Sequence, residues 1–100
     1  MQEIEIPIPA GSDIALIEST IDHAILHAGL HVTLRSTLNK YRGCIHWHLK
    51  KGKKRGTLEL TLLPKEERAW FSIHQNRKGD WIDETVSTLM SHFQTDWKQD

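Results

Sequence analysis

The sequence predicts an α+β domain in the order strand–helix–four-stranded antiparallel meander–helix, with both helices on one face of a curved sheet. Two segments, residues 13–28 and 82–97, repeat apolar side chains at helical spacing, which is typical of helices with one apolar side. Four segments between residues 30 and 74 alternate apolar and polar side chains, the period of a half-buried strand. Connections of about four residues join these strands, as in antiparallel hairpins.

The chain begins with a short strand and the first helix. Apolar and polar side chains alternate over residues 4–8, and the prolines there favour an edge position because proline cannot donate a hydrogen bond to a neighbouring strand. Ser12 is the expected N-cap of the helix, and Gly29 is expected to end it. The predicted apolar stripe comprises Ile14, Ile17, Ile21, Ala24, Ile25 and Ala28.

The four central strands and the second helix complete the predicted core. The strand residues expected to face the helices are Leu30, Val32, Leu34 and Leu38, then Ile45, Trp47 and Leu49, then Leu58, Leu60 and Leu62, and finally Ala69, Phe71 and Ile73. A turn over residues 76–79 leads to the second helix, for which Asp80 is the expected N-cap. The apolar side of this helix comprises Ile82, Val86, Leu89, Met90, Phe93 and Trp97.

This order of elements resembles the TATA-box-binding-protein-like fold, in which a curved antiparallel sheet carries both helices on one side. The resemblance is one of topology, covers nearly all of residues 1–100 and implies a single domain. No sequence motif of that family is present, so the resemblance implies a fold and no site residue.

The composition excludes several classes of protein. Lys plus Arg and Asp plus Glu each number 13, which argues against a polybasic tail and against an acidic disordered chain. The charges are nevertheless segregated, because residues 1–34 contain no Lys or Arg and residues 35–58 contain no Asp or Glu. One cysteine, an acidic N-terminus and the lack of a long apolar run predict a cytoplasmic protein without a membrane partner.

The face of the sheet opposite the helices is the expected functional surface. Its predicted side chains include His31, His46, His48, Glu59, Trp70 and His74. The expected register places His46 between Arg35 and Glu59, an arrangement in which a carboxylate orients an imidazole as a general base. Opposite charges across a sheet are equally typical of ordinary pair stabilisation, and no activated nucleophile accompanies them, so no catalytic residue is predicted.

Metal binding is the second chemistry that this face suggests. His46, His48 and His74 are a possible set of imidazole ligands for zinc, and Cys44 would add a thiolate. No familiar zinc-ligand spacing is present, however, so the sequence predicts neither a metal nor another cofactor.

The predicted function is that of a non-enzymatic module that binds an anionic partner, either a nucleic acid or an acidic protein. The expected anion-binding residues are Arg35, Lys50, Lys51, Lys53, Lys54 and Arg55. One alternative is a small-ligand-binding protein or enzyme, with a pocket under the last helix lined by Trp47, Phe93 and Trp97. The other is a self-associating domain, a homodimer formed through an exposed edge strand or through Leu16 and Leu26.

Overall fold

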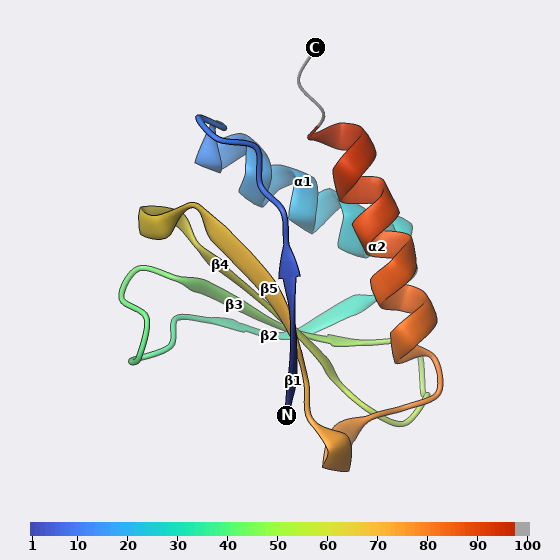
Figure 1. Cartoon of the computed structure of the whole chain (residues 1–100). Helices are drawn as coiled ribbons and strands as arrows, with labels where there is room; N and C mark the ends of the chain where they lie inside the picture. Colours follow the sequence, from blue (N-terminus) through green and yellow to red (C-terminus); the bar gives the residue numbers. More distant parts are fainter. Residues whose placement is uncertain (98–100) are drawn as a thin grey trace.

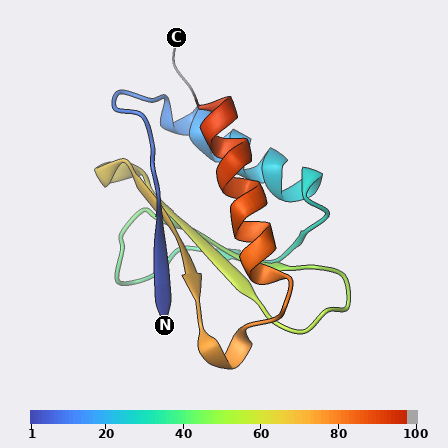
Figure 2. The same cartoon turned by 45° about the vertical axis from the view of Figure 1, so that its right-hand side comes forward.

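A computed structural model describes residues 1–97 and contains the predicted α+β architecture. The elements are β1 (Gln2–Ile6), α1 (Ile14–His27), β2 (His31–Ser36), β3 (Ile45–Lys50), β4 (Leu58–Leu63), η1 (Pro64–Glu66), β5 (Arg68–Ile73), η2 (Gln75–Arg77) and α2 (Ile82–Asp96). The strands form one antiparallel sheet in the order β1-β5-β4-β3-β2. Both helices lie on the same side of this sheet, which leaves the opposite face open (Figures 1 and 2). Among the described residues, no helix combines the length and apolar character needed to cross a membrane.

The main core lies between the sheet and the two helices, as the apolar periodicity predicts. Trp47, Phe71 and Phe93 are fully buried, and the rings of Phe93 and Trp97 stack with their centroids 4.6 Å apart. The indole N–H of Trp47 donates a hydrogen bond of 2.9 Å to Asp22 of α1, so one polar contact sets the position of this helix over β3. The indole nitrogen of the buried Trp47 therefore has a hydrogen-bond partner.

The two predicted N-caps are wrong. Asp13 caps α1 by accepting a hydrogen bond of 3.0 Å from the Ala15 N–H, whereas the hydroxyl of Ser12 is directed to the carbonyl of Pro9. At α2 the N-cap position is occupied by Trp81, and no side chain caps the helix. The indole N–H of Trp81 donates instead to the carbonyl of Arg55 at 2.7 Å, so a tertiary contact determines where α2 begins.

A register shift in β2 reverses the faces that alternation predicts for Leu34 and Arg35. The irregularity lies between Val32 and Leu34. After it, Leu34 pairs with His48 on the open face, and Arg35 pairs with Trp47 on the helix side. An extra residue in a strand changes which side chains point to each face, and sequence alternation alone does not reveal it.

The loop between β2 and β3 buries part of the open face. Trp70, expected to be exposed there, is only 4% accessible because it packs with Cys44, Leu63, Leu38 and Tyr41. The rings of Tyr41 and Trp70 meet edge to face at 5.1 Å. This small second core removes Trp70 from the surface on which a partner would dock.

Candidate functional site

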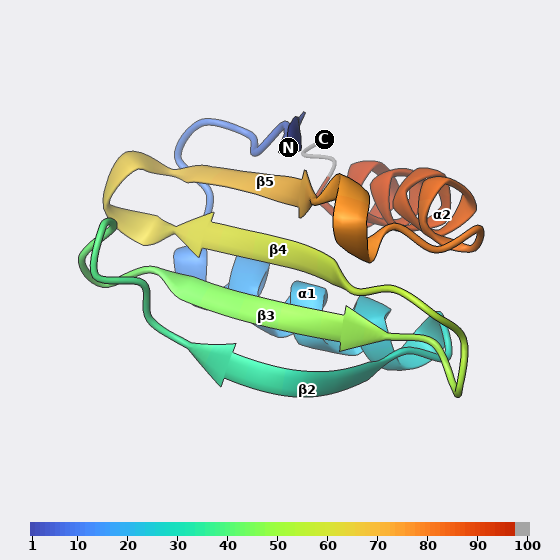
Figure 3. The ribbon, with the colours of Figure 1, turned by 90° about the horizontal axis from the view of Figure 1, so that it is seen from below.

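Glu59 occupies the centre of the open face, on the middle strand β4. It pairs with His48 of β3 on one side and with Ser72 of β5 on the other. Figure 3 looks onto this face, with α1 behind the strands and α2 beyond the end of β5. Although no helix covers Glu59, its side chain is only 9% exposed, because polar side chains surround it. A carboxylate buried to this degree requires charged or hydrogen-bonding partners.

Four positively charged or titratable side chains surround the two carboxylate oxygens of Glu59. Its Oε1 lies 3.1 Å from Nε2 of His46 and 3.7 Å from Nε2 of His48. Its Oε2 lies 3.0 Å from Nε2 of His74 and 3.7 Å from Nη1 of Arg77. Strands β3 and β4 and the segment of η2 with its N-cap therefore contribute to one cluster, which we call the Glu59 cluster (His46, His48, Glu59, His74 and Arg77).

The sequence predicts the shared face of this cluster but not its register. His46 is opposite Thr61 rather than Glu59, and His48 takes the position that was expected for His46. The imidazole of His46 reaches Glu59 diagonally across the two strands. Arg77 was missed altogether, because it lies in a turn beyond β5 and no periodic pattern relates it to the sheet.

His46 is the most deeply buried imidazole of the cluster, with its side chain 5% exposed. Its Nδ1 lies 2.8 Å from the hydroxyl of Thr61, so both ring nitrogens have partners. Burial is the main cause that lowers the pKa of His46; the charge of Glu59 opposes this effect, and His48 and His74 reinforce it. The ring is therefore neutral at pH 7, and the Thr61 hydroxyl can donate to Nδ1 while Nε2–H donates to Glu59.

A pocket of about 200 Å³ opens beside the cluster. His46, Glu59, Thr61 and Ser72 contribute to its lining from the sheet, and Tyr41 contributes from the β2–β3 loop. Cys44 does not line this pocket; its sulfur accepts a hydrogen bond of 3.3 Å from the Leu38 N–H within the small second core. The thiolate considered as a zinc ligand is thus held apart from the histidines.

The predicted anion-binding residues lie at one end of the sheet, with the exception of Arg35. Arg35 bonds to Glu18 of α1 at 2.6 Å, lies 3.5 Å from Asp22, and places its guanidinium over the Trp47 ring at 5.3 Å. Its expected position on the open face is therefore wrong. Its charge is matched by two carboxylates of the helix that covers the other face.

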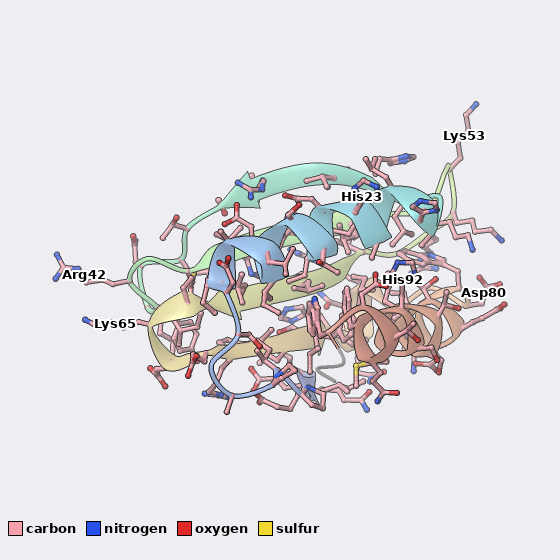
Figure 4. The ribbon with its side chains drawn as sticks, turned by 90° about the horizontal axis from the view of Figure 1, so that it is seen from above. His23, Arg42, Lys53, Lys65, Asp80 and His92 are labelled. Carbon is pink, nitrogen blue, oxygen red and sulfur yellow. The ribbon has the colours of Figure 1, made fainter. Side chains whose placement is uncertain are left out.

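The β3–β4 hairpin over residues 50–55 carries the remaining predicted anion-binding residues, namely Lys50, Lys51, Lys53, Lys54 and Arg55. His31, also predicted on this face, pairs with Lys50, and its Nε2 lies 3.4 Å from the Gly52 carbonyl oxygen. His31 therefore belongs to the hairpin end of the sheet. Arg42 and Lys65 lie at the other end, far from Lys53 (Figure 4).

The structure adds two further basic residues to this end, Arg77 and Lys78. The N–H of Thr57, just after the hairpin, donates to the Arg77 carbonyl at 2.8 Å. Gly56 approaches Gly79 so closely that a Cβ added at Gly56 would lie 2.6 Å from the Gly79 nitrogen. This contact joins two basic segments about 25 residues apart in the sequence.

A second pocket, of about 160 Å³, lies between α1 and α2 and is lined by His27 and His92 among others. Neither of these two pockets is lined by Trp47, Phe93 or Trp97, the residues expected to surround a ligand under the last helix. Those three side chains are instead packed into the main core.

No known protein family matches the chain, and the comparisons with curated proteins and with solved structures yield no match either. The site's chemistry therefore has to be inferred from its own residues.

Proposed function

We propose that this protein is a binding module for an anionic partner and that the partner is a nucleic acid. The observation that carries the proposal is the meeting of the basic hairpin, residues 50–55, with Arg77 and Lys78 at one end of the sheet. Phosphate groups are bound by clusters of Lys and Arg. Because the net charge of this chain is zero, its attraction for phosphate has to come from a local excess of positive charge.

The charges of the hairpin are available to a partner. Lys53, Lys54 and Arg55 are exposed, and among residues 1–97 no carboxylate forms an ion pair with any basic side chain of the hairpin. Lys78, in contrast, is paired with Asp83 at 3.2 Å. The hairpin therefore supplies most of the charge that phosphates would neutralise, and Arg77, half exposed, adds to it.

The expected mode of binding is through the phosphate backbone. Stacking of bases requires exposed aromatic rings, and Trp70 is buried under the β2–β3 loop. Contacts to phosphates position a nucleic acid without reading its sequence, so we expect little sequence preference.

Removing the hairpin charges is expected to abolish most of the binding. The test uses a fluorescently labelled single-stranded RNA and measures its anisotropy at several salt concentrations. Replacing Lys53, Lys54 and Arg55 together with glutamine should weaken binding at low salt by at least about tenfold. Because each lost phosphate contact lowers the slope of log K against log salt by about 0.7, the slope should decrease in magnitude by about 2.

The chain offers a matched control at the opposite end of the sheet. Lys40, Arg42 and Lys65 are also two lysines and one arginine, and all three are exposed. Replacing these with glutamine makes the same change in net charge and should leave most of the affinity intact. Equal losses in the two triple variants, or no RNA binding by the wild type at low salt, would contradict the proposal. Binding of polyglutamate in place of RNA would assign the surface to acidic proteins.

Self-association is a second candidate function, favoured by the exposed edge of the sheet. Within residues 1–97, no strand pairs with the outer side of β2, and Val32 and Leu34 of this strand are 40% and 46% exposed. Leu16 and Leu26 are also exposed, on α1. An exposed apolar edge strand is a template for pairing with another chain.

A homodimer formed at this edge is expected to dissociate when Leu34 is replaced with lysine. The added charge would lie on the open face next to the pairing strand of the second copy, where it would replace an apolar contact and repel its counterpart in that copy. Sedimentation velocity at high protein concentration measures the change from dimer to monomer. A wild type that sediments as a monomer would exclude this candidate.

We also infer that the chain has the TATA-box-binding-protein-like fold. The strand order β1-β5-β4-β3-β2 and the position of both helices on one face support this assignment. It rests on topology alone and carries no functional residue.

A further inference from the structure

Three potential metal-ligating atoms converge at the rim of the pocket on the open face. One ring nitrogen of His46, one ring nitrogen of His48 and one carboxylate oxygen of Glu59 all lie within 4.8 Å of one another. His46 and His48 are two residues apart on β3 and therefore share a face, and Glu59 is directly opposite His48 on β4. Regular β-structure thus sets the approximate positions of all three.

The spacing of these atoms is close to that of a metal's ligands. With metal–ligand bonds of about 2.1 Å, ligand atoms in tetrahedral geometry lie about 3.4 Å apart. Oε1 of Glu59 is 3.1 Å from His46 Nε2 and 3.7 Å from His48 Nε2. The His48 side chain is 22% exposed, so its ring has room to rotate. A small rotation would bring its ligand nitrogen closer to that of His46.

Within the cluster, Nε2 of the partly exposed His48 side chain makes no hydrogen bond of normal length. Both imidazoles direct Nε2 at the same oxygen, and their rings lie edge to face with centroids 5.0 Å apart. The contact from His46 has the length of a hydrogen bond, but 3.7 Å from His48 is too long for one. A cation between the three atoms would satisfy all of them.

Neighbouring side chains orient the ligands as outer partners do in metal sites. Metal binding through Nε2 uses the other neutral tautomer of His46, in which Nδ1–H donates to the Thr61 hydroxyl at 2.8 Å and Nε2 carries the free electron pair. His74 lies 3.0 Å from the other carboxylate oxygen, Oε2, and so directs Oε1 toward His46 and His48. The carboxylate is therefore positioned to bind through a single oxygen.

We propose that His46, His48 and Glu59 form a binding site for a divalent first-row transition metal, for which Zn²⁺ is the probe. Two imidazoles and one carboxylate are a ligand set that suits such metals. Three protein ligands leave a coordination position for water or a small ligand, and the adjoining pocket provides space for it. The three proposed ligands are not hairpin residues, although Arg77 lies beside both Glu59 and the hairpin on which the proposed nucleic-acid surface depends.

The proposal is tested by titrating the protein with Zn²⁺ in a calorimeter and with Co²⁺ in a spectrophotometer. The wild type should bind one Zn²⁺ per chain at the cluster, and Co²⁺ should give visible absorption bands of a site with nitrogen and oxygen ligands. His48→Gln should weaken Zn²⁺ binding at least tenfold, and Glu59→Gln should weaken it further. Thr61→Val should weaken binding about tenfold, because the loss of an outer partner typically costs 10- to 100-fold in affinity.

His48→Gln is the decisive variant, because its side chain is partly exposed and its replacement leaves the buried Glu59–His46 contact in place. Circular dichroism and thermal unfolding of each variant without metal confirm that it is folded. If Glu59→Gln does not fold, the result for His48→Gln still decides the question.

Surface histidines provide the control. The rings of His23 and His27 lie 5.6 Å apart on α1, and His92 of α2 is 6.1 Å from His27, so these residues could hold Zn²⁺ weakly. A variant with His23→Gln and His27→Gln should retain the tight site. The proposal is overturned if this variant loses the binding, if His48→Gln binds Zn²⁺ as tightly as the wild type, or if the wild type binds none at millimolar Zn²⁺.

Discussion

Replacing Trp47 with alanine is expected to lower the free energy of unfolding by about 4 kcal/mol, the range found for large aromatic side chains removed from a core. Trp47 is fully buried on β3 under α1. Besides its apolar contacts it donates the hydrogen bond to Asp22 and lies beneath the guanidinium of Arg35. The variant therefore removes the side chain through which strand and helix are joined.

Urea unfolding followed by circular dichroism measures this loss. For a domain of about 100 residues, each kcal/mol corresponds to a change in Tm of about 4–8 °C, so Tm should fall by about 15–30 °C. Trp47→Phe is the control, because it retains an aromatic ring and removes mainly the hydrogen bond to Asp22; we expect it to cost about 1–2 kcal/mol. If Trp47→Ala lowers the free energy of unfolding by less than Trp47→Phe does, the Trp47 side chain does not hold α1 against β3.

Replacing Gly79 with alanine is expected to cost about 3 kcal/mol and to weaken RNA binding without changing any charge. An added Cβ would lie 1.9 Å from the carbonyl oxygen of Arg55, a distance that no contact tolerates, so the backbone must shift. The same oxygen accepts the hydrogen bond from Trp81 that marks the start of α2. The shift would move the hairpin away from Arg77. The two parts of the proposed phosphate-binding surface would then no longer lie side by side.

Gly52→Ala separates this steric effect from the general cost of replacing a glycine. Gly52 has a φ of +56° but open space around it, so alanine there should cost only about 1 kcal/mol and leave the RNA affinity unchanged. Chemical unfolding and RNA anisotropy measured on both variants distinguish the outcomes. Equal stability and equal RNA affinity of the two variants would show that the Gly56–Gly79 approach does not organise the basic end.

Much of the fold could be predicted because the spacing of apolar residues indicates both the type of element and the side of it that is buried. The spacing of Ile17, Ile21 and Ile25 buries one side of α1, and the alternation around Trp47 buries one side of β3, as the structure has them. The same alternation places His46 and Glu59 together on the open face. The side of a helix or strand on which a residue lies follows from the local spacing of apolar residues, which can be read directly from the sequence.

The register between strands could not be predicted, and the candidate site depends on it. A difference of two residues in a hairpin keeps every side chain on its face but changes its neighbours, so Thr61 rather than Glu59 is opposite His46. The irregularity in β2 went further and exchanged the faces of Leu34 and Arg35. Turn geometry and packing against α1 decide such shifts, and neither leaves a periodic signal.

The sequence by itself determined the α+β order, most of the main core apart from Val32, Leu34 and Leu38, and the clustering of basic residues in a single hairpin. Only the tertiary structure decided that Trp70 is covered, that Arg77 joins both the hairpin and Glu59, and that His46, His48 and Glu59 converge. The reason is the range of the interactions. Periodicity and charge runs are local properties of the chain, whereas a site built from two strands and a turn depends on contacts between residues that are distant in the sequence.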